Sequence, residues 1–514
     1  MKNPLSFLTR QNLEKSIGAL QSRFPIASII VLIMTGLLAY VINTESESTT
    51  LIRVILSLVV TFFLSIGVSL FIEGEKQKTS LAWHSLPIIY GIIFFFTINP
   101  ITNGWMLDSI TYFILHLVGF IALLFFAPYC HGILYRRDRG IEYTNYFSRT
   151  AWSLFMACIV GGALVALGFI AISSVMALFD LSSAIQKYKV YENWAIFSLS
   201  LIAPLYCLVH LPKIAEINKN IYEINRFFSF LIRFIAVPFI VIYFVILYAY
   251  SVKVLMNFQD WPKGMISWTV VGFSTFGYLT YIFSKPYEKE NVILAAVRRV
   301  FPYVVPAQIL MLAYSIYLRI AQYDLTMNRY FVVIFGCWLA IISVYYILSQ
   351  RKSLTMITVS LAAISLFVSV GPWSVYQFPI SRQHTRLVKN LEVAGMLKDG
   401  VISKKPAPLE ADLENTIYSG IQYICDFSEC ETIKKLFAKE LTGKEEEYAK
   451  KWTTETYNAG KKYPGMSNWE IVNEVTTALG IAYRPLGIQY TNKYISLGGK
   501  FSYDETTIFP LDTT

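Results

Sequence analysis

A polar cluster at residues 317–331, YLRIAQYDLTMNRYF, separates two long apolar stretches. Arg319 and Arg329 flank Asp324 in this cluster. Guanidinium groups bind carboxylates and phosphates through charge-assisted, often bidentate hydrogen bonds. Two interpretations follow: a clamp in which Asp324 pairs with both arginines, or an anion site for a group such as a lipid phosphate. We favour the clamp, and the same candidate site includes Tyr323, Asn328 and Tyr330.

Two glutamates could support metal chemistry near the start of the chain. Glu45 and Glu47 lie in NTESESTT, between two apolar segments. Paired carboxylates can hold a divalent cation, as a lipid-linked sugar transferase requires. However, such enzymes carry their acidic pair in a long loop that covers the substrate, and this loop is short. A short acidic outer loop also agrees with the charge bias of membrane proteins, so we predict neither a metal nor any other cofactor.

Two cysteines in the C-terminal part form a candidate disulfide. Cys425 and Cys430 lie in ICDFSEC, at the junction of two predicted helices. A disulfide would be the normal state of such a pair in an oxidising compartment. A free pair is the alternative, and a metal site is disfavoured because no second pair of cysteines or nearby histidine completes four ligands.

The composition shows which elements must position these residues. The chain has 514 residues, 55% hydrophobic and 15% charged, whereas soluble domains carry about 25% charged residues. Apolar blocks of roughly 20 residues match the thickness of the bilayer core. The sequence therefore predicts a polytopic α-helical membrane protein with a small C-terminal extramembrane domain.

Eleven transmembrane helices are predicted from the apolar blocks. In the region 286–306, Pro302 and Pro306 are expected to break the helix, and residues 291–300 resemble an amphipathic interfacial segment rather than a crossing. The predicted spans are 25–43, 51–72, 81–99, 108–127, 149–179, 191–209, 228–252, 265–284, 302–318, 330–349 and 354–371. The predicted divisions are a cytoplasmic segment 1–24, a helix bundle 25–372 and an extracytoplasmic domain 373–514. In the fifth span, Ala157, Gly161, Gly162 and Gly168 favour close helix packing.

The charge distribution predicts the orientation. Lys and Arg at alternate ends of the spans number 20 on one side and 7 on the other. The positive-inside rule places the richer side, and with it the N-terminus, in the cytoplasm. An odd number of spans then places the C-terminal domain and the 317–331 cluster outside. Trp261 and Trp373 fall at predicted membrane boundaries, where indole rings serve as interface anchors.

The C-terminal domain reads as α+β. Residues 381–397, 413–427 and 430–441 have helical character, and 467–480 forms a further helix that ends at Gly480. Residues 488–511 alternate and contain Gly-Gly, which predicts short strands. An extramembrane domain of this size offers a surface for an envelope protein partner.

Four segments resemble a known family when taken in order: LIRFIAVPFIVIYFVILYAY, DWPKG, YDLTMNRY and GPWSVYQFPISRQHTRL. The chain is similar to a bacterial multi-pass family catalogued as domain of unknown function 4153, over about residues 140–397 and more weakly beyond. The resemblance implies a bacterial inner-membrane protein and no assigned reaction. It also implies a glycine where this chain has Asp324, so the carboxylate between the arginines is a departure.

Several function classes find no support in the residues. The sequence has no Walker A loop, HExxH or GxSxG motif. The predicted spans hold no central Asp or Glu, which disfavours a proton pump, and His116 alone fits a buried core residue better than a proton carrier. The C-terminal part has no basic stripe for nucleic acid. We therefore expect a non-enzymatic envelope scaffold or sensor in contact with membrane lipids. The alternatives are a transporter or lipid-handling permease and, less favoured, the sugar transferase.

Overall fold

The computed structural model describes most of the helical parts of the chain. The described residues are 18, 20–46, 48–75, 81–98, 107–130, 140–179, 188–219, 230–256, 265–288, 292–349, 352–398, 401–402, 408–428, 472–473, 476–477 and 479–481. They belong to two compact units. Unit 1 comprises Met1–Lys253, Thr269–Met311 and Ile334–Ser374, and unit 2 comprises Val254–Trp268, Leu312–Val333 and Val375–Thr514.

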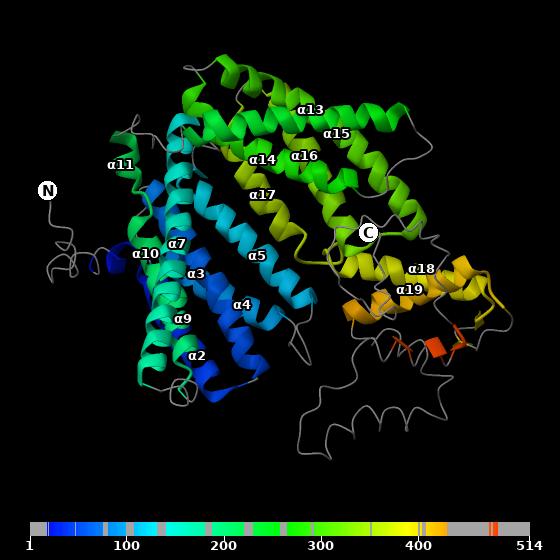
Figure 1. Ribbon diagram of the computed structural model, residues 1–514, viewed down its shortest axis with the longest axis horizontal. Helices are drawn as coiled ribbons and strands as arrows, with labels where there is room; N and C mark the ends of the chain where they lie inside the picture. Colours follow the sequence, from blue (N-terminus) through cyan, green and yellow to red (C-terminus); the bar gives the residue numbers. More distant parts are fainter. Residues whose placement is uncertain are drawn as a thin grey trace. The chain divides into compact units, whose positions relative to one another are not determined.

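Long apolar helices make up most of the described residues (Figure 1). The first group is α2 (Pro25–Thr44), α3 (Thr49–Glu75), α4 (Leu81–Thr97), α5 (Leu107–Phe126), α7 (Gly140–Phe179), α9 (Val190–Ile196), α10 (Ala203–His210) and α11 (Ile214–Lys219). The second group is α13 (Val237–Met256), α14 (Met265–Phe283), α15 (Val292–Tyr323), α16 (Met327–Leu348), α17 (Thr355–Phe367), α18 (Gln377–Val393) and α19 (Ala411–Ser428).

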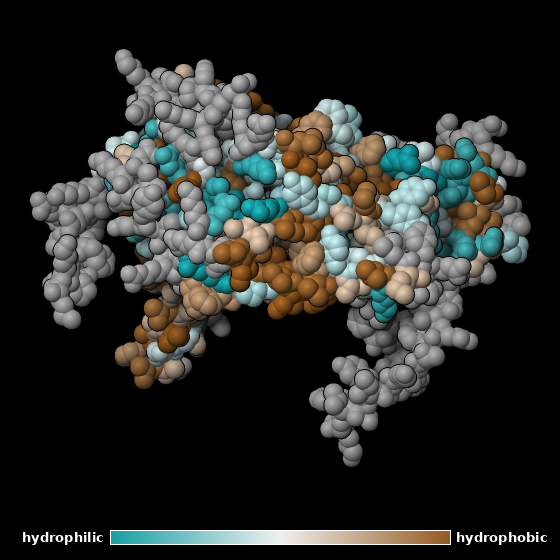
Figure 2. All heavy atoms as spheres, turned by 90° about the horizontal axis from the view of Figure 1, so that it is seen from above, coloured by the Kyte–Doolittle hydropathy of each residue, from teal (hydrophilic) through white to brown (hydrophobic). Residues whose placement is uncertain are grey.

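The apolar helices confirm a polytopic helical membrane protein. Eight helical stretches among the described residues are long and apolar enough to cross a bilayer. Large apolar side chains such as Phe96, Ile170 and Leu178 are exposed, and apolar groups cover broad areas of the surface in Figure 2. Such surfaces are stable against lipid tails and costly in water. Each predicted span overlaps a helix, while the count of eleven crossings stays a prediction.

The expected break at Pro302 and Pro306 is wrong. Both prolines lie inside α15, which continues for 32 residues. Proline removes a hydrogen-bond donor, yet membrane helices tolerate it where neighbouring groups satisfy the freed carbonyls. The carbonyls freed here are those of Arg298 and Pro302, four residues before each proline. The Tyr248 hydroxyl of α13 donates to the nearby carbonyl of Val304 at 2.7 Å. The charged segment before the prolines is therefore helical and continuous with the apolar one.

An apolar core joins α2, α3, α5, α7 and α10 in unit 1. Its fully buried members include Val31, Leu70, Leu124 and Leu208. Close packing also links α3 to α4 and α5 to α17, the second pair lying side by side in Figure 1. Burial of these faces against one another leaves the opposite faces for lipid.

Arg23 ties three segments of unit 1 together at one end of this core. Its Nε lies 2.8 Å from Glu73 Oε2. Its two terminal nitrogens donate to the carbonyls of Leu211 and Pro212, each at 2.7 Å. The second oxygen of Glu73 accepts the backbone N–H of Ile214 at 3.1 Å. The planar guanidinium thus caps the chain between α10 and α11 in a way that a lysine could not reproduce.

The glycines of α7 differ in what surrounds them. A Cβ at Gly168 would lie 1.7 Å from the indole nitrogen of Trp194 in α9, and a Cβ at Gly161 would lie 2.9 Å from the Cβ of Ala203 in α10. A Cβ at Gly162 would meet nothing within 4 Å. Close helix approach in α7 therefore needs Gly161 and Gly168, and Gly162 takes no part in it.

Two helices form the core of unit 2. Helices α18 and α19 pack side by side (Figure 1). Leu387 and Leu391 of α18 meet Ile417, Ile421 and Ile424 of α19 in a buried cluster. Strands β1 (Leu397–Lys398) and β2 (Val401–Ile402) form a short antiparallel pair after α18.

The structure confirms two of the predicted C-terminal helices. Helix α18 covers most of the segment expected to be helical at 381–397 but ends at Val393, and α19 covers the segment 413–427. The segments predicted as a helix at 430–441 and as strands at 488–511 lie outside the described residues. The α+β character of this domain therefore stays a prediction.

Candidate functional site

The polar cluster forms the connection between α15 and α16, and its centre is a left-handed residue. Asp324 has φ 57°, a conformation that glycine adopts freely and that aspartate tolerates better than most residues. Its N–H donates to the carbonyl of Ile320 at 2.8 Å, which closes the last turn of α15. Its Oδ1 accepts the N–H of Leu325 at 2.7 Å. The family resemblance implied glycine here, and the backbone geometry explains why.

Helix α18 holds this connection through the polar side chains of Arg382, Gln383 and Arg386. Arg382 Nη2 lies 3.3 Å from Asp324 Oδ1. Gln383, which is only 4% exposed, donates from Nε2 to the carbonyls of Tyr323 at 3.1 Å and Leu325 at 3.0 Å. Arg386 Nη2 donates to a further carbonyl of the same connection, that of Gln322, at 3.0 Å. Unsatisfied carbonyls at the end of α15 are thus paired by side chains of α18.

Helix α19 contributes one contact to the start of α16. The Tyr423 hydroxyl accepts the backbone N–H of Met327 at 2.8 Å. Burial raises the pKa of Tyr423 to about 12, although this hydrogen bond and the charge of Arg329 act in the opposite direction. The phenol therefore stays protonated and neutral at physiological pH. Together α18 and α19 fix both helix ends that meet at the connection.

The remaining residues of the predicted cluster have distinct roles. Arg329 Nη1 donates to the carbonyl of Asp324 at 2.8 Å, and its guanidinium lies 5.3 Å from the ring centre of Tyr323. Tyr330 is buried and its ring lies 5.7 Å from that of Phe378. Asn328 is exposed, and Arg319 is half-buried on α15. Most of the cluster therefore stabilises the connection itself.

The ion-pair partner of Asp324 is Arg382 rather than Arg319 or Arg329. Among the described residues, Asp324 forms an ion pair with Arg382 alone. The left-handed backbone and the contacts of α18 account for this choice, since Arg329 instead donates to backbone oxygen. Sequence reasoning missed Arg382, Gln383, Arg386 and Tyr423. A signal was present, because the resembling segments YDLTMNRY and SRQHTRL contain both sides of this contact.

The predicted interface tryptophans and the predicted disulfide do not belong to the α15–α16 connection. Trp373 donates from Nε1 to the carbonyl of Phe367 at 2.9 Å and is 43% exposed. Trp261, Cys430 and Glu47 lie outside the described residues. Cys425 is disulfide-bonded, and its predicted pairing with Cys430 stays a prediction.

Glu45 is one of the two glutamates considered as ligands of a divalent cation. Its carboxylate lies 2.7 Å from the Lys189 ammonium in unit 1. The hydrogen bond and charge of Lys189 lower the pKa of Glu45. No group of three or more His, Cys, Asp or Glu side chains suited to a metal occurs among the described residues. Glu45 thus has a lysine partner, and the metal expected for a transferase stays untested at the neighbouring glutamate.

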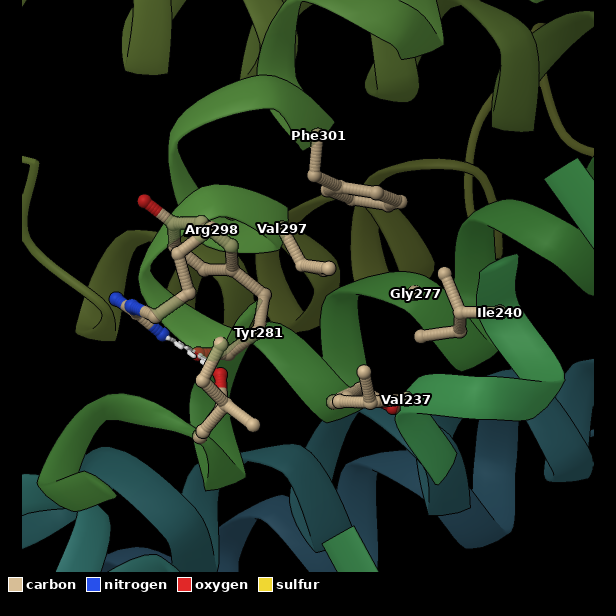
Figure 3. A pocket seen from close by; sticks show the side chains of 10 residues that line it. Val237, Ile240, Gly277, Tyr281, Val297, Arg298 and Phe301 are labelled. Atoms are coloured by element: carbon tan, nitrogen blue, oxygen red, sulfur yellow. Dashed lines mark hydrogen bonds between the residues drawn. The ribbon is translucent and has the colours of Figure 1, made fainter. Parts of the chain in front are cut away.

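A buried arginine in unit 1 lines a very small pocket (Figure 3). The Arg298 guanidinium lies 4.1 Å from the ring centre of Tyr281, donates to the carbonyl of Tyr281 and lies 3.1 Å from Ser284 Oγ. Its Nε is 3.4 Å from Glu288 Oε2. The pocket encloses about 10 Å³, roughly the space of one water. Arg298 is thus a packing element between α14 and α15.

Comparison with known proteins agrees with the fold. Residues 29–390 match the model of a family described as a domain of unknown function, DUF4153. A curated protein of Pasteurella multocida (strain Pm70), the uncharacterized protein PM1469, is 22% identical over 394 residues, which cover 76% of this chain. The matched region spans 62% of that relative's length. No solved structure matches the chain. Because the family model covers more than half of the chain, the protein belongs to the DUF4153 family.

Proposed function

We propose that this protein is a non-enzymatic scaffold or sensor of the bacterial cell envelope, and that α18 and α19 are its partner-binding part. The observation that carries the proposal is the set of contacts between these helices and the α15–α16 connection. A partner that moves α18 would act directly on Asp324 and on the carbonyls held by Gln383. In this role, the polar cluster transmits a movement of α18 to the connection between α15 and α16.

The contacts differ in strength in a way that suits a sensor. The two hydrogen bonds of Gln383 are buried, and each such bond left unmade would cost about 1–3 kcal/mol. The Arg382–Asp324 pair is weaker, because the Arg382 side chain is 53% exposed and exposed pairs contribute only about 0–1 kcal/mol. A charged partner can therefore compete for Arg382 while Gln383 keeps the helices in register.

In the part of the chain that the structure describes, one face of α18 is exposed and could contact a partner protein. Ser381, Arg382, Thr385, Lys389 and Glu392 are all exposed on this helix. Charged and small polar side chains of this kind are typical of the rim of a transient interface.

We place α18 and α19 outside the cytoplasm in an inner-membrane protein with eleven crossings and a cytoplasmic N-terminus. The bias of 20 against 7 positive residues supports this orientation. A membrane-impermeant thiol reagent tests it on cysteines introduced at Thr385 and Arg299, both exposed, after serine replaces the four unbonded cysteines. Thr385→Cys should react in intact cells and Arg299→Cys only after permeabilisation. The reverse pattern would overturn the orientation.

The partner function is tested by a photo-crosslinking amino acid at Ser381 or Thr385, with lipid-facing Ile170 as the control position. We expect a protein adduct from α18, absent at Ile170. Arg382→Asp should change the adduct yield, and the swap Arg382→Asp with Asp324→Arg should restore it. Protein adducts from neither α18 position, or a yield that is indifferent to both charge changes, would refute the sensor function.

A further inference from the structure

A pocket of about 310 Å³ lies in unit 1 between α7 and the segment that joins α10 to α11. Its polar and aromatic lining comprises Arg149, Trp152, Tyr206, His210, Lys213 and Glu216. By the charge count these residues belong to the cytoplasmic ends of their helices. The pocket is far larger than the roughly 10–15 Å³ that a single water needs by the same measure.

Arg149 is the central cation of this pocket. Among the described residues, its guanidinium forms neither an ion pair nor a side-chain hydrogen bond, although the residue is half-buried. Two arginines at other helix ends in unit 1 differ, since Arg23 pairs with Glu73 and Arg53 donates to the carbonyl of Phe95. A guanidinium carries five N–H donors in a fork that matches a phosphate. Arg149 therefore offers its donors to the pocket.

His210 and Lys213 add further donors. The His210 ring is stacked on Tyr206, with ring centres 4.0 Å apart, and its Nδ1 lies 2.8 Å from the Tyr206 carbonyl oxygen. Because a carbonyl oxygen only accepts, Nδ1 carries a hydrogen. Nε2 forms no hydrogen bond among the described residues, and it donates to an anion only when the ring is protonated to the imidazolium form. The Lys213 ammonium lies 3.6 Å from the Glu216 carboxylate, with both side chains more than half exposed. Glu216 offsets Lys213, so Arg149 supplies the net positive charge.

An apolar surface adjoins the basic groups. Val209 lines the pocket and is 44% exposed, and Trp152 lies with its ring centre 5.8 Å from that of Phe155. Phe155 and Ile159 are one turn apart on α7 and are 53% and 45% exposed. This arrangement is complementary to a lipid. The basic groups beside tryptophan match a phosphate at the headgroup level, and the exposed apolar stripe matches the acyl chain below it.

We propose that this pocket binds the phosphate of an anionic phospholipid headgroup through Arg149, assisted by His210 and Lys213, with an acyl chain along Phe155 and Ile159. Pockets of basic residues between helices on the cytoplasmic side are the usual place for such headgroups. The chemistry recognised is a phosphate ester. A soluble phosphate compound would satisfy Arg149 equally well but would gain nothing from the apolar stripe.

Native mass spectrometry of the delipidated full-length protein provides the test. Phosphatidylglycerol is titrated into the detergent-solubilised protein, with diacylglycerol of the same chains as the uncharged control. We expect saturable binding of phosphatidylglycerol and none of diacylglycerol at the same concentration. Arg149→Ala should weaken the binding by about tenfold, the equivalent of one or two lost charge-assisted hydrogen bonds. Arg149→Lys should restore part of it.

Arg299→Ala is the matched control, because Arg299 is exposed and has no partner among the described residues. It removes the same charge and should leave binding unchanged. Equal binding by the Arg149→Ala and Arg299→Ala proteins would overturn the site, provided that both unfold at the wild-type temperature. If Arg149→Ala unfolds early, Phe155→Ser reports on the acyl chain instead, and unchanged affinity there would refute the lipid. Competition by inorganic phosphate or glycerol phosphate at the affinity of the lipid would also refute a lipid ligand.

Discussion

Asp324 and Arg382 join the α15–α16 connection to α18, with Nη2 and Oδ1 3.3 Å apart. The two residues lie 58 positions apart in the chain. Asp324 also holds the left-handed conformation that the connection requires. One carboxylate therefore serves both the local turn and a tertiary contact.

Substitutions at Asp324 should separate these two roles. Asp324→Ala removes the bond to Leu325 and the ion pair while the left-handed strain stays, so we expect a loss of about 1–2 kcal/mol in the free energy of unfolding. Asp324→Gly loses the same contacts but relieves the strain, so its stability should exceed that of the alanine variant by about 1 kcal/mol. Unfolding in mixed detergent micelles measures both, and an alanine variant as stable as the glycine variant would contradict the role of the backbone.

Gln383→Leu should destabilise unit 2 more than any change to the ion pair. The leucine is similar in size but leaves the carbonyls of Tyr323 and Leu325 without their buried donor. We expect a loss of roughly 2–4 kcal/mol. Gln422→Leu on the exposed face of α19 is the matched control and should stay within about 0.5 kcal/mol of wild type. Hydrogen exchange of α18 and of residues 322–330 checks the effect locally, and unchanged protection there would argue against it.

Two glycines of α7 should respond in opposite directions to alanine. Gly168→Ala forces the Trp194 indole away, since the new Cβ would lie 1.7 Å from its nitrogen, and should cost about 1–3 kcal/mol. Gly162→Ala enters open space and should be neutral or stabilising by up to about 1 kcal/mol, because alanine favours helix. The melting temperatures of the two variants in one detergent measure the contrast. Equal melting temperatures would show that α7 and α9 do not pack as described.

Arg23→Lys should be almost as damaging as Arg23→Ala. Lysine keeps the charge near Glu73 but cannot reach that carboxylate and the carbonyls of Leu211 and Pro212 together. We expect a loss of about 1–3 kcal/mol for either variant, read from thermal unfolding. Arg299→Lys, at an exposed position, is the control and should be silent. Full stability of Arg23→Lys would mean that charge alone holds the α10–α11 segment.

Hydropathy was sufficient to locate the apolar helices, because a span must be long and apolar whatever its neighbours are. Every predicted span overlaps a helix of the structure. Local pattern also located α18 and α19. It failed at Pro302 and Pro306, because a proline inside a membrane helix does not by itself end the helix.

The candidate site could be located in the sequence but not assembled from it. The cluster around Asp324 stands out by composition, and pairing it with Arg319 and Arg329 follows from proximity along the chain. Its actual partner comes from α18, and nothing in the periodicity of either segment encodes a contact across 58 positions. The implied family glycine pointed to the backbone conformation, which is a local property. Gln383 and Tyr423 act through backbone groups, which no side-chain pattern reveals.

The length of α7 has a consequence for the bilayer. Forty helical residues form a rod about 60 Å long, twice the roughly 30 Å of hydrocarbon. Its early residues Tyr143 and Tyr146 are buried within the protein, while Leu167 and Ile170 are exposed. In a thinner membrane, α7 must therefore tilt or shift along the bilayer normal. Either response changes the depth of Arg149 in the bilayer.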